Sequence, residues 1–210
     1  MDAKDKVRIG EFSRGGASRV DTKALDHDFY SDTITPFGFF LPDFNETYLY
    51  MNQSSTTSDF IVDCLEDFWK NYKYKFPKVT KILLNTDNGG ENSSRRTQFM
   101  KRIVDFVENE KIEIELAYYP PYHSKYNPVE RVWGVLEKHW NGSLLDSVSK
   151  VIGFAKSMTY NKVSPVVELV TKVYDKGVKL TKSQMSEVEK KIVRAVGIEK
   201  WSVLVPVSAG

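Results

Sequence analysis

The chain has 210 residues, which is enough for one large domain or for one domain with an appendage. Hydrophobic residues make up 41% and aromatic residues 13%, so a sizeable core can form and an intrinsically disordered chain is not expected. The formal net charge is only +2, with both signs abundant, so the total charge neither favours nor excludes a nucleic-acid partner.

The sequence also limits the compartment and the kinds of metal site. Cys64 is the single cysteine, which excludes an internal disulfide framework and a zinc site made of several cysteines. No apolar run approaches the roughly 20 residues of a membrane span. The first residues are polar and charged and show no apolar signal segment. We therefore expect a soluble, cytoplasmic protein.

Short strands dominate the beginning of the sequence. Alternation of apolar and charged residues predicts a strand over residues 7–9. Two further strands are expected over residues 37–41 and 48–51, on either side of a turn at residues 42–45.

From residue 57 onward, helices and strands alternate. Apolar residues that recur every three or four positions predict amphipathic helices, and short apolar or alternating runs predict strands. The strand at 79–84 is apolar and partly β-branched, so we expect it to be buried. In chain order the predicted elements are helix 57–72, strand 79–84, helix 94–109, strand 112–119, helix 127–140, helix 144–158, strand 166–174 and helix 181–196.

This order predicts an α/β fold with a mixed sheet, in which three antiparallel strands precede alternating helices and strands. It is compatible with a ribonuclease H-like layout, although the order of elements alone does not establish that fold. We expect residues 1–160 to form this domain. Residues 161–210 are expected to form a small C-terminal extension of unknown role.

Asp87 is the first candidate catalytic residue, because it follows the predicted strand 79–84. Open α/β sheets bind ligands at the carboxyl ends of their strands. Gly89 and Gly90 come soon after it, and we expect them to permit a tight turn with positive φ and to leave room for a substrate backbone. The alternative is an ordinary turn in which Asp87 accepts local backbone N–H groups. The residues by themselves leave both interpretations open.

Glu130 and Asp2 are the other two candidate carboxylates. Asn127, Pro128 and Glu130 have the spacing of a capping box with proline at the first helical position, so Glu130 has a purely local role available. A glutamate in the first turn also projects toward the start of its helix, where it can face a cleft. Asp2 has the alternative of being an exposed residue near the terminus.

Three carboxylates from separate elements are suited to two Mg²⁺ ions. Mg²⁺ prefers oxygen ligands and keeps several of its waters. Two such ions about 4 Å apart activate the attacking oxygen and stabilise the leaving oxygen in phosphoryl transfer. The three histidines are scattered, and neither a P-loop nor a Gly-x-Ser-x-Gly elbow is present, so no competing catalytic centre is predicted.

Two motifs carry a resemblance to a known family. They are Thr-Asp-Asn-Gly-Gly-Glu-Asn at residues 86–92 and Tyr-Pro-Pro-Tyr-His-Ser-Lys-Tyr-Asn-Pro-Val-Glu-Arg at residues 119–131. With Asp2-Ala3-Lys4, His27-Asp28-Phe29 and the 43-residue step from Asp87 to Glu130, the sequence resembles the DDE transposases of bacterial insertion sequences. The nearest group is the ISAzo-type, or Rhodopirellula-type, family, with mariner-like enzymes as distant relatives. The resemblance covers residues 2–142.

The resemblance implies a ribonuclease H-like catalytic domain in which Asp2, Asp87 and Glu130 form the catalytic and metal-binding triad. Such enzymes use two Mg²⁺ ions, with Mn²⁺ as a substitute, to hydrolyse a phosphodiester at the transposon end. They then drive the freed 3′-hydroxyl into target DNA. The implied partners are transposon-end and target DNA and further copies of the chain, and the implied location is the bacterial nucleoid.

The family also has a strand that leads into the first Asp and a helix-turn-helix region before the catalytic domain, and this sequence contains neither. We therefore expect a C-terminal part of a transposase, as a fragment, a frame-split product or a decayed remnant. The alternative function is a non-catalytic remnant that only associates with DNA or partner subunits. A plain nuclease of the same fold is a third possibility.

Cationic residues close in sequence to the three carboxylates are candidate phosphate contacts, with solvated surface charge as the alternative. His123 is a candidate for contacting DNA or orienting a water. The predicted DNA-binding residues are Arg14, Arg19, Arg95, Arg96, His123, Lys125 and Arg131.

Overall fold

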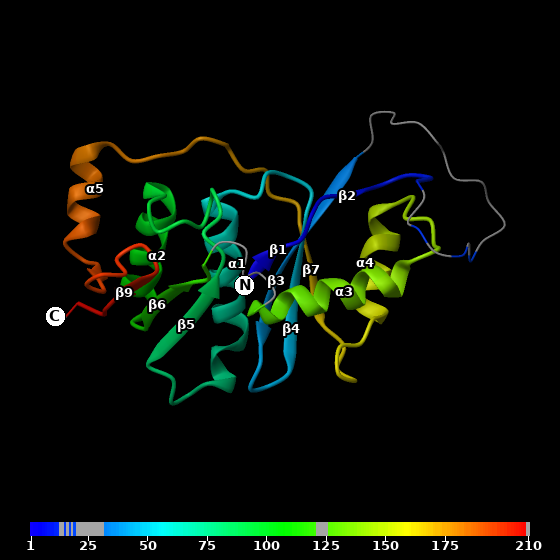
Figure 1. Cartoon of the computed structure of the whole chain (residues 1–210), viewed down its shortest axis with the longest axis horizontal. Coiled ribbons are helices and arrows are strands. Elements are labelled where there is room, and N and C mark those ends of the chain that lie inside the picture. Colours follow the sequence, from blue (N-terminus) through cyan, green and yellow to red (C-terminus); the bar gives the residue numbers. More distant parts are fainter. Residues whose placement is uncertain (13–14, 16, 18, 20–31, 121–125, 209–210) are drawn as a thin grey trace. The chain divides into compact units, whose positions relative to one another are not determined.

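The computed structural model describes residues 1–12, 15, 17, 19, 32–120 and 126–208 (Figure 1). Its contacts divide the chain into two compact units, each made of two segments. The first unit contains Met1–Ser54 and Pro128–Val173, and the second contains Ser55–Asn127 and Tyr174–Gly210. Each unit has its own sheet and helices. No helix in the described part of the chain is long and apolar enough to cross a membrane.

The first unit is built on a five-stranded sheet. Its strands are β1 (Asp2–Ala3), β2 (Val7–Arg8), β3 (Thr33–Leu41), β4 (Glu46–Asn52) and β7 (Val166–Val170). Strand β3 pairs antiparallel with β1, β2 and β4, while β7 pairs parallel with β4. Strands β2, β3 and β4 therefore form the three-stranded antiparallel start that the sequence predicts. Strand β1 was not predicted, and β7 adds a parallel strand from much later in the chain.

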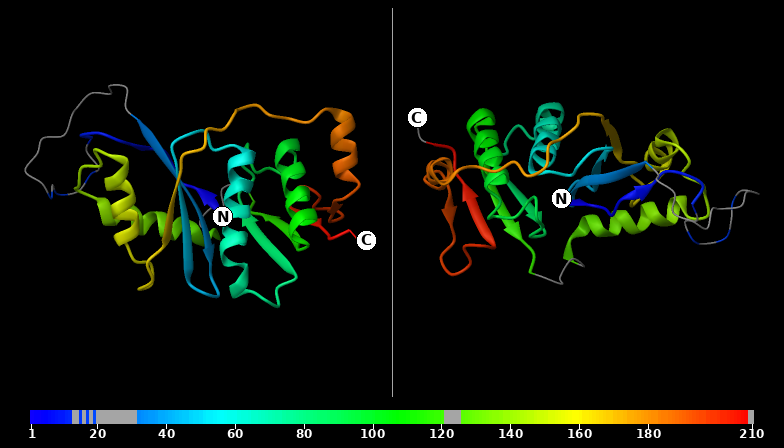
Figure 2. Two further views of the ribbon diagram at one scale, coloured as in Figure 1. Left: turned by 180° about the vertical axis from the view of Figure 1, so that it is seen from behind. Right: turned by 90° about the horizontal axis from the view of Figure 1, so that it is seen from above.

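Helices α3 (Pro128–Trp140) and α4 (Val148–Ser157) complete the first unit (Figure 2). Helix α3 packs against β3, and α4 packs against β7. The predicted apolar stripe of α3 is confirmed, because its large side chains are buried in one core with residues of the sheet. Ser147 caps α4 by accepting a hydrogen bond from the backbone N–H of Lys150 at 3.3 Å. The helix consequently begins later than the predicted residue 144.

The second unit has a four-stranded sheet of order β5-β6-β9-β8. The strands are β5 (Lys81–Thr86), β6 (Glu113–Tyr118), β8 (Val193–Arg194) and β9 (Ser202–Val205). Strands β5 and β6 run parallel, as expected when a helix connects them, and β9 pairs antiparallel with both β6 and β8. Sequence analysis did not predict β8 or β9 as strands.

Helices whose bounds lie wholly within the described residues complete the second unit. They are α1 (Ser58–Tyr72), the short 3₁₀ helix η1 (Lys73–Lys75), α2 (Thr97–Glu110) and α5 (Lys182–Glu189). Helix α1 begins where predicted, because Thr57 accepts a hydrogen bond from the N–H of Phe60 at 3.3 Å. Helix α2 ends at Lys111, which adopts the left-handed conformation with φ of 55°. Helix α2 packs against α1, β6, β9 and α5.

The predicted mixed α/β class is confirmed, and the elements are compatible with a ribonuclease H-like fold. The described strands nevertheless form two sheets, whereas the prediction was one mixed sheet. The strand order of a ribonuclease H-like fold therefore stays a prediction. Residues after 160 contribute to both sheets, since β7 joins the first and β9 joins the second. The division of the chain at residue 160 stays a prediction. A separate role for residues 161–210 likewise stays a prediction.

Three local predictions need correction. The strand expected at 79–84 exists as β5, but it is not buried: Val79 is 42% exposed and Leu83 is 53% exposed. Successive side chains of a strand point to opposite faces of the sheet, and along β5 the side chains on one of these faces are exposed. The strand expected at 166–174 ends at Val170. The helix expected at 181–196 ends at Glu189, after which the chain forms β8.

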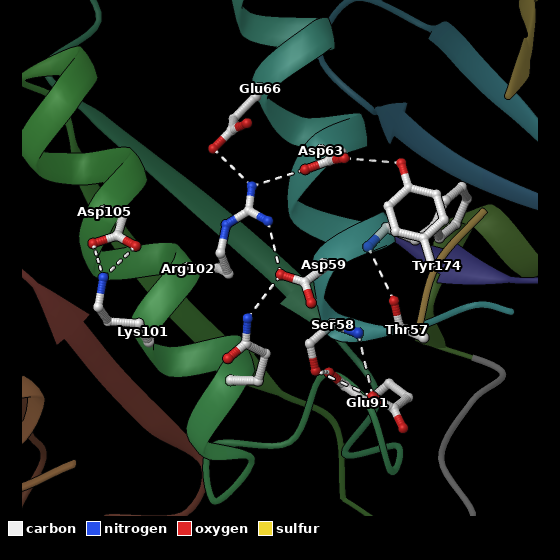
Figure 3. Close-up of polar contacts among 12 residues, drawn as sticks. Thr57, Ser58, Asp59, Asp63, Glu66, Glu91, Lys101, Arg102, Asp105 and Tyr174 are labelled. Carbon is white, nitrogen blue, oxygen red and sulfur yellow. Dashed lines mark hydrogen bonds and ion pairs between the residues drawn. The ribbon is translucent and has the colours of Figure 1, made fainter. Parts of the chain in front are cut away.

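Arg102 joins the two long helices of the second unit (Figure 3). From α2 its guanidinium contacts three carboxylates of α1: Asp59 at 2.8 Å, Asp63 at 2.8 Å and Glu66 at 3.0 Å. Burial of Arg102 opposes its charge, but the hydrogen bonds to these carboxylates outweigh that effect and raise the pKa of the guanidinium. The hydroxyl of Tyr174 donates to Asp63 at 2.9 Å and so connects the later segment of this unit to the same cluster.

We predict that Arg102→Met lowers the free energy of unfolding by about 1.5–3 kcal/mol, the range for hydrogen bonds to charged groups, because three carboxylates then lose their common partner. The matched control is Lys101→Met, since Lys101 forms a partly exposed pair with Asp105 within α2. That change should cost about 0.3–0.5 kcal/mol. Urea unfolding measures both, and equal losses would show that the cluster does not stabilise the unit.

Candidate active site

Asp87 immediately follows β5 and is exposed. The pairing of β5 with β6 continues to Thr86, which lies opposite Tyr118, and the N–H of Tyr119 donates to the carbonyl of Thr86 at 2.9 Å. Asp87 therefore begins the loop at the carboxyl ends of two parallel strands. This is the position in which an open α/β sheet binds ligands, as the sequence predicts.

Asn92 holds the Asp87 carboxylate from within the same loop. Its Nδ2 group donates to Oδ1 of Asp87 at 2.8 Å and to Oγ1 of Thr86 at 2.7 Å. Asn92 itself is 7% exposed. Asp87 is thus an exposed carboxylate whose orientation is fixed by a buried neutral donor.

Tyr118 supports Asn92 from strand β6. Its hydroxyl donates to the backbone carbonyl of Asn92 at 2.9 Å, and its side chain is 6% exposed. Burial raises the pKa of the Tyr118 hydroxyl, the positive charge of Arg194 acts in the opposite direction, and the negative charge of Asp87 raises it further. The hydroxyl is therefore protonated at neutral pH and available as a donor.

Glu91 ties the same loop to the start of α1 (Figure 3). The backbone N–H of Ser58 donates to Oε2 of Glu91 at 3.2 Å, and the Ser58 hydroxyl donates to the Glu91 carbonyl at 2.6 Å. A carboxylate at a helix N-terminus is favoured by the helix dipole. Arg96 pairs with Glu91 at 3.2 Å. Glu91 is therefore engaged in holding the loop.

Residues near the C-terminus contact the loop as well. The hydroxyl of Ser94 donates to the carbonyl of Lys200 at 3.1 Å, and the guanidinium of Arg194 donates to the carbonyl of Ser94 at 3.0 Å. The guanidinium of Arg194 is itself paired with Glu189 at 2.7 Å. The loop after Asp87 thus has anchors in β6, α1 and the β8–β9 region.

Asp2 lies in the first unit, on β1, opposite Gly38 of β3. The indole Nε1 of Trp133, on α3, donates to Oδ2 of Asp2 at 3.3 Å. Gly38 makes this contact possible: a Cβ atom at that position would lie 2.8 Å from Cη2 of Trp133 and 3.0 Å from Cδ2 of Leu49. The close approach of α3 to β3 therefore places the indole beside Asp2.

Glu130 is exposed in the first turn of α3. It precedes Trp133 by three positions and Glu137 by seven, so all three project from one side of the helix. Glu137 forms an ion pair with Lys4, just beyond β1. Because Trp133 and Glu137 both contact the N-terminal segment, Glu130 projects from the side of α3 that faces Asp2. The predicted capping role of Glu130 stays a prediction.

The predicted DNA contacts have different surroundings. Arg95 and Arg131 are exposed, whereas Arg96 is paired with Glu91. Arg19 donates from its guanidinium to the carbonyl of His139 at 3.3 Å, near the end of α3. The predicted contacts Arg14, His123 and Lys125 lie outside the described residues.

The donor chemistry around Asp87 fits a hard divalent cation. Oδ1 of Asn92 is buried and has no hydrogen-bond partner among the described residues. A Cβ atom on Gly89 would lie 3.0 Å from this oxygen and 3.3 Å from each carboxylate oxygen of Asp87. Carboxylate and amide oxygens are the ligands that Mg²⁺ prefers. Within the described ranges, no three His, Cys, Asp or Glu side chains form a group that could hold a metal ion.

Sequence analysis missed the residues that hold the candidate carboxylates. Asn92 was recognised only as part of a motif, and Trp133 only as part of a buried stripe. The prediction of positive φ at the paired glycines is wrong, since neither Gly89 nor Gly90 adopts it. Gly89 is instead close to the oxygens of Asp87 and Asn92, a requirement of space that no local pattern reveals.

One comparison with known proteins gives a match. A family model described as the Rhodopirellula transposase DDE domain matches residues 1–206, nearly the whole chain. Comparisons with curated proteins and with solved structures gave no match.

We predict that Gly38→Ala lowers the free energy of unfolding by about 1–3 kcal/mol, because the added methyl group collides with Trp133 and Leu49. The control is Gly134→Ala on α3, where an added Cβ meets nothing within 4 Å. A helical glycine replaced by alanine should stabilise the protein by roughly 0.5–1 kcal/mol. Thermal unfolding of both variants tests this, and a neutral Gly38→Ala would contradict the close packing.

Proposed function

Because the chain belongs to the Rhodopirellula transposase DDE domain family, we propose that it carries out the DNA cleavage and joining of a transposase. The proposed reaction is metal-dependent hydrolysis of a phosphodiester at the transposon end. Attack of the freed 3′-hydroxyl on target DNA follows. Asp2, Asp87 and Glu130 are the proposed catalytic and metal-binding residues.

The observation that carries this proposal is the arrangement around Asp87. An exposed carboxylate at the end of two parallel strands is held by Asn92, and its loop is anchored through Glu91, Ser94 and Tyr118. In the first unit, Asp2 is held by Trp133, and Glu130 projects from the same side of α3.

A divalent cation, Mg²⁺ or Mn²⁺, would activate the attacking oxygen and stabilise the leaving oxygen; two ions are proposed. The chain's own residues would hold these ions and orient their ligands. Asp2 and Asp87 accept hydrogen bonds from the neutral donors Trp133 and Asn92. The neutral amide of Asn92 fixes the orientation of the Asp87 carboxylate and leaves its negative charge available to a cation.

DNA is the proposed partner, and phosphate contacts would come from cations near the carboxylates. Arg95 and Arg131 support this best, because both are exposed. Arg19, Arg96, Arg14, His123 and Lys125 remain proposed contacts from the sequence. Since transposition joins two DNA ends, we also propose that several copies of the chain assemble on DNA.

We expect the chain to nick supercoiled DNA in the presence of Mn²⁺, and more slowly with Mg²⁺. Asp87→Ala, Glu130→Ala and Asp2→Ala should each reduce nicking to the background seen with chelator, because each removes a proposed metal ligand. A gel assay that separates supercoiled from open-circular plasmid measures this.

The controls are Asp43→Ala and Glu168→Ala. Each removes an exposed carboxylate that is distant in sequence from all three residues of the proposed triad. Both should nick as the unchanged protein does. Metal-dependent nicking that persists in Asp87→Ala and Glu130→Ala would refute the site. A chain that folds, binds DNA and never nicks it would favour a non-catalytic remnant.

Arg95 and Arg96 offer a neighbouring pair for testing DNA contacts. Arg95→Gln should make the plot of log K against log salt concentration for duplex DNA less steep by about 0.9, the value for one phosphate contact. It should leave the unfolding midpoint unchanged. Arg96→Gln should lower that midpoint, because Glu91 loses its ion pair with Arg96. An unaltered salt slope in Arg95→Gln would exclude Arg95 as a contact.

A further inference from the structure

The amide side chain of Asn92 is a buried polar group of the second unit that is not part of the proposed triad. It is 7% exposed and lies between Thr86, Asp87 and Gly89. We propose that Asn92 is a positioning residue that presents the Asp87 carboxylate to a divalent cation. This proposal rests on the proposed function of Asp87 as a metal ligand.

Both hydrogens of the Asn92 amide have acceptors. An amide NH₂ group can donate twice, and here it donates to Oγ1 of Thr86 at 2.7 Å and to Oδ1 of Asp87 at 2.8 Å. Thr86 is the last residue of β5 and is fully buried. The amide therefore connects an exposed carboxylate to a fixed point of the sheet and restricts the rotation of that carboxylate.

The backbone of Asn92 is held separately from its side chain. Tyr118 donates to the Asn92 carbonyl from the neighbouring strand, and the adjacent Glu91 is bound to the start of α1. These contacts hold the backbone of Asn92. The amide therefore stays in place when a ligand displaces the Asp87 carboxylate. This is the property expected of a group that supports a metal ligand.

The oxygen of the Asn92 amide indicates which kind of ligand the Asp87 carboxylate binds. Oδ1 of Asn92 is buried and lacks a hydrogen-bond partner among the described residues. A buried acceptor without a partner costs about 1–3 kcal/mol. Both Asp87 oxygens and this amide oxygen lie within 3.3 Å of the point that a Gly89 Cβ would occupy. Such a gathering of oxygens is favourable when a cation, or a water bound to one, lies near it.

This arrangement requires glycine at position 89, because a side chain there would approach the oxygens of Asn92 and Asp87 too closely. Its φ is not positive, so an alanine at position 89 would meet no backbone strain. The new methyl group would press on Oδ1 of Asn92 at 3.0 Å and on the Asp87 oxygens at 3.3 Å. Gly90 differs in this respect, because a Cβ atom there meets nothing within 4 Å. The two neighbouring glycines therefore form a matched pair for an experiment.

The test is an Mn²⁺ titration of the full 210-residue chain, in which free Mn²⁺ is followed by electron paramagnetic resonance. Removal of a group that supports a metal ligand typically weakens metal binding about 10–100-fold, so we expect that loss in Asn92→Ala. Gly89→Ala should weaken binding in the same direction. Asn88→Ala and Gly90→Ala, both exposed positions of the same loop, should bind as the unchanged chain does. Asp87→Ala reports on the proposed ligand itself.

Thermal unfolding of each variant separates a positioning role from a loss of fold. Should Asn92→Ala fail to fold, the Gly89→Ala and Gly90→Ala pair decides, since neither disturbs the backbone conformation. Unchanged Mn²⁺ affinity in folded Asn92→Ala or in Gly89→Ala, alongside weakened binding in Asp87→Ala, overturns the role of Asn92 and leaves the proposed function standing. Unchanged affinity in Asp87→Ala overturns the proposed function, and the role of Asn92 with it.

Discussion

The candidate site depends on one constraint, which is that Asp87 lies beyond the end of its strand and is exposed. Among the described strands of the four-stranded sheet, β5 pairs with β6 alone, and this pairing does not extend to the Asp87 side chain. The loop from Asn88 to Arg96 supplies the missing constraint through hydrogen bonds to β6, to the start of α1 and to the region of β8 and β9. The late segment of the chain is therefore part of what positions Asp87, since Arg194 and Lys200 hold the loop at Ser94.

In both units a neutral hydrogen-bond donor orients a candidate carboxylate. In the second unit a buried amide donates to Asp87, and in the first unit a buried indole donates to Asp2. Each of the two donors is neutral, and each orients a carboxylate. Each arrangement also uses a glycine for space: Gly89 lies against the oxygens of Asp87 and Asn92, and Gly38 lies against the indole of Trp133. These neutral donors give a defined orientation to the exposed carboxylate of Asp87 and to the half-buried carboxylate of Asp2.

Local patterns predicted much of the fold, and they failed where longer-range packing decides. The apolar period of α1 and its Thr57 cap, and the hairpin of β3 and β4, are properties of short segments and were predicted well. The exposure of Leu83 depends on whether other elements cover its face of the sheet, which the sequence of β5 alone does not reveal. Strand β9 has four residues and gains its stability from pairing with β6. At the site, the Asp87 and Glu130 motifs were recognisable, but Asn92 looks like any turn residue until its amide is seen beside Thr86 and Asp87.

The central claim is that Asp87, Asp2 and Glu130 are ligands of divalent cations. The most direct measurement is a crystal structure of the chain with Mn²⁺, with the ions located by their anomalous scattering. The account predicts anomalous peaks within about 2–2.6 Å of carboxylate oxygens of Asp87 and of Asp2 or Glu130, which is the range of metal–oxygen distances for hard cations. Ordered Mn²⁺ found only at other carboxylates, with Asp87 bound to no ion, would contradict it.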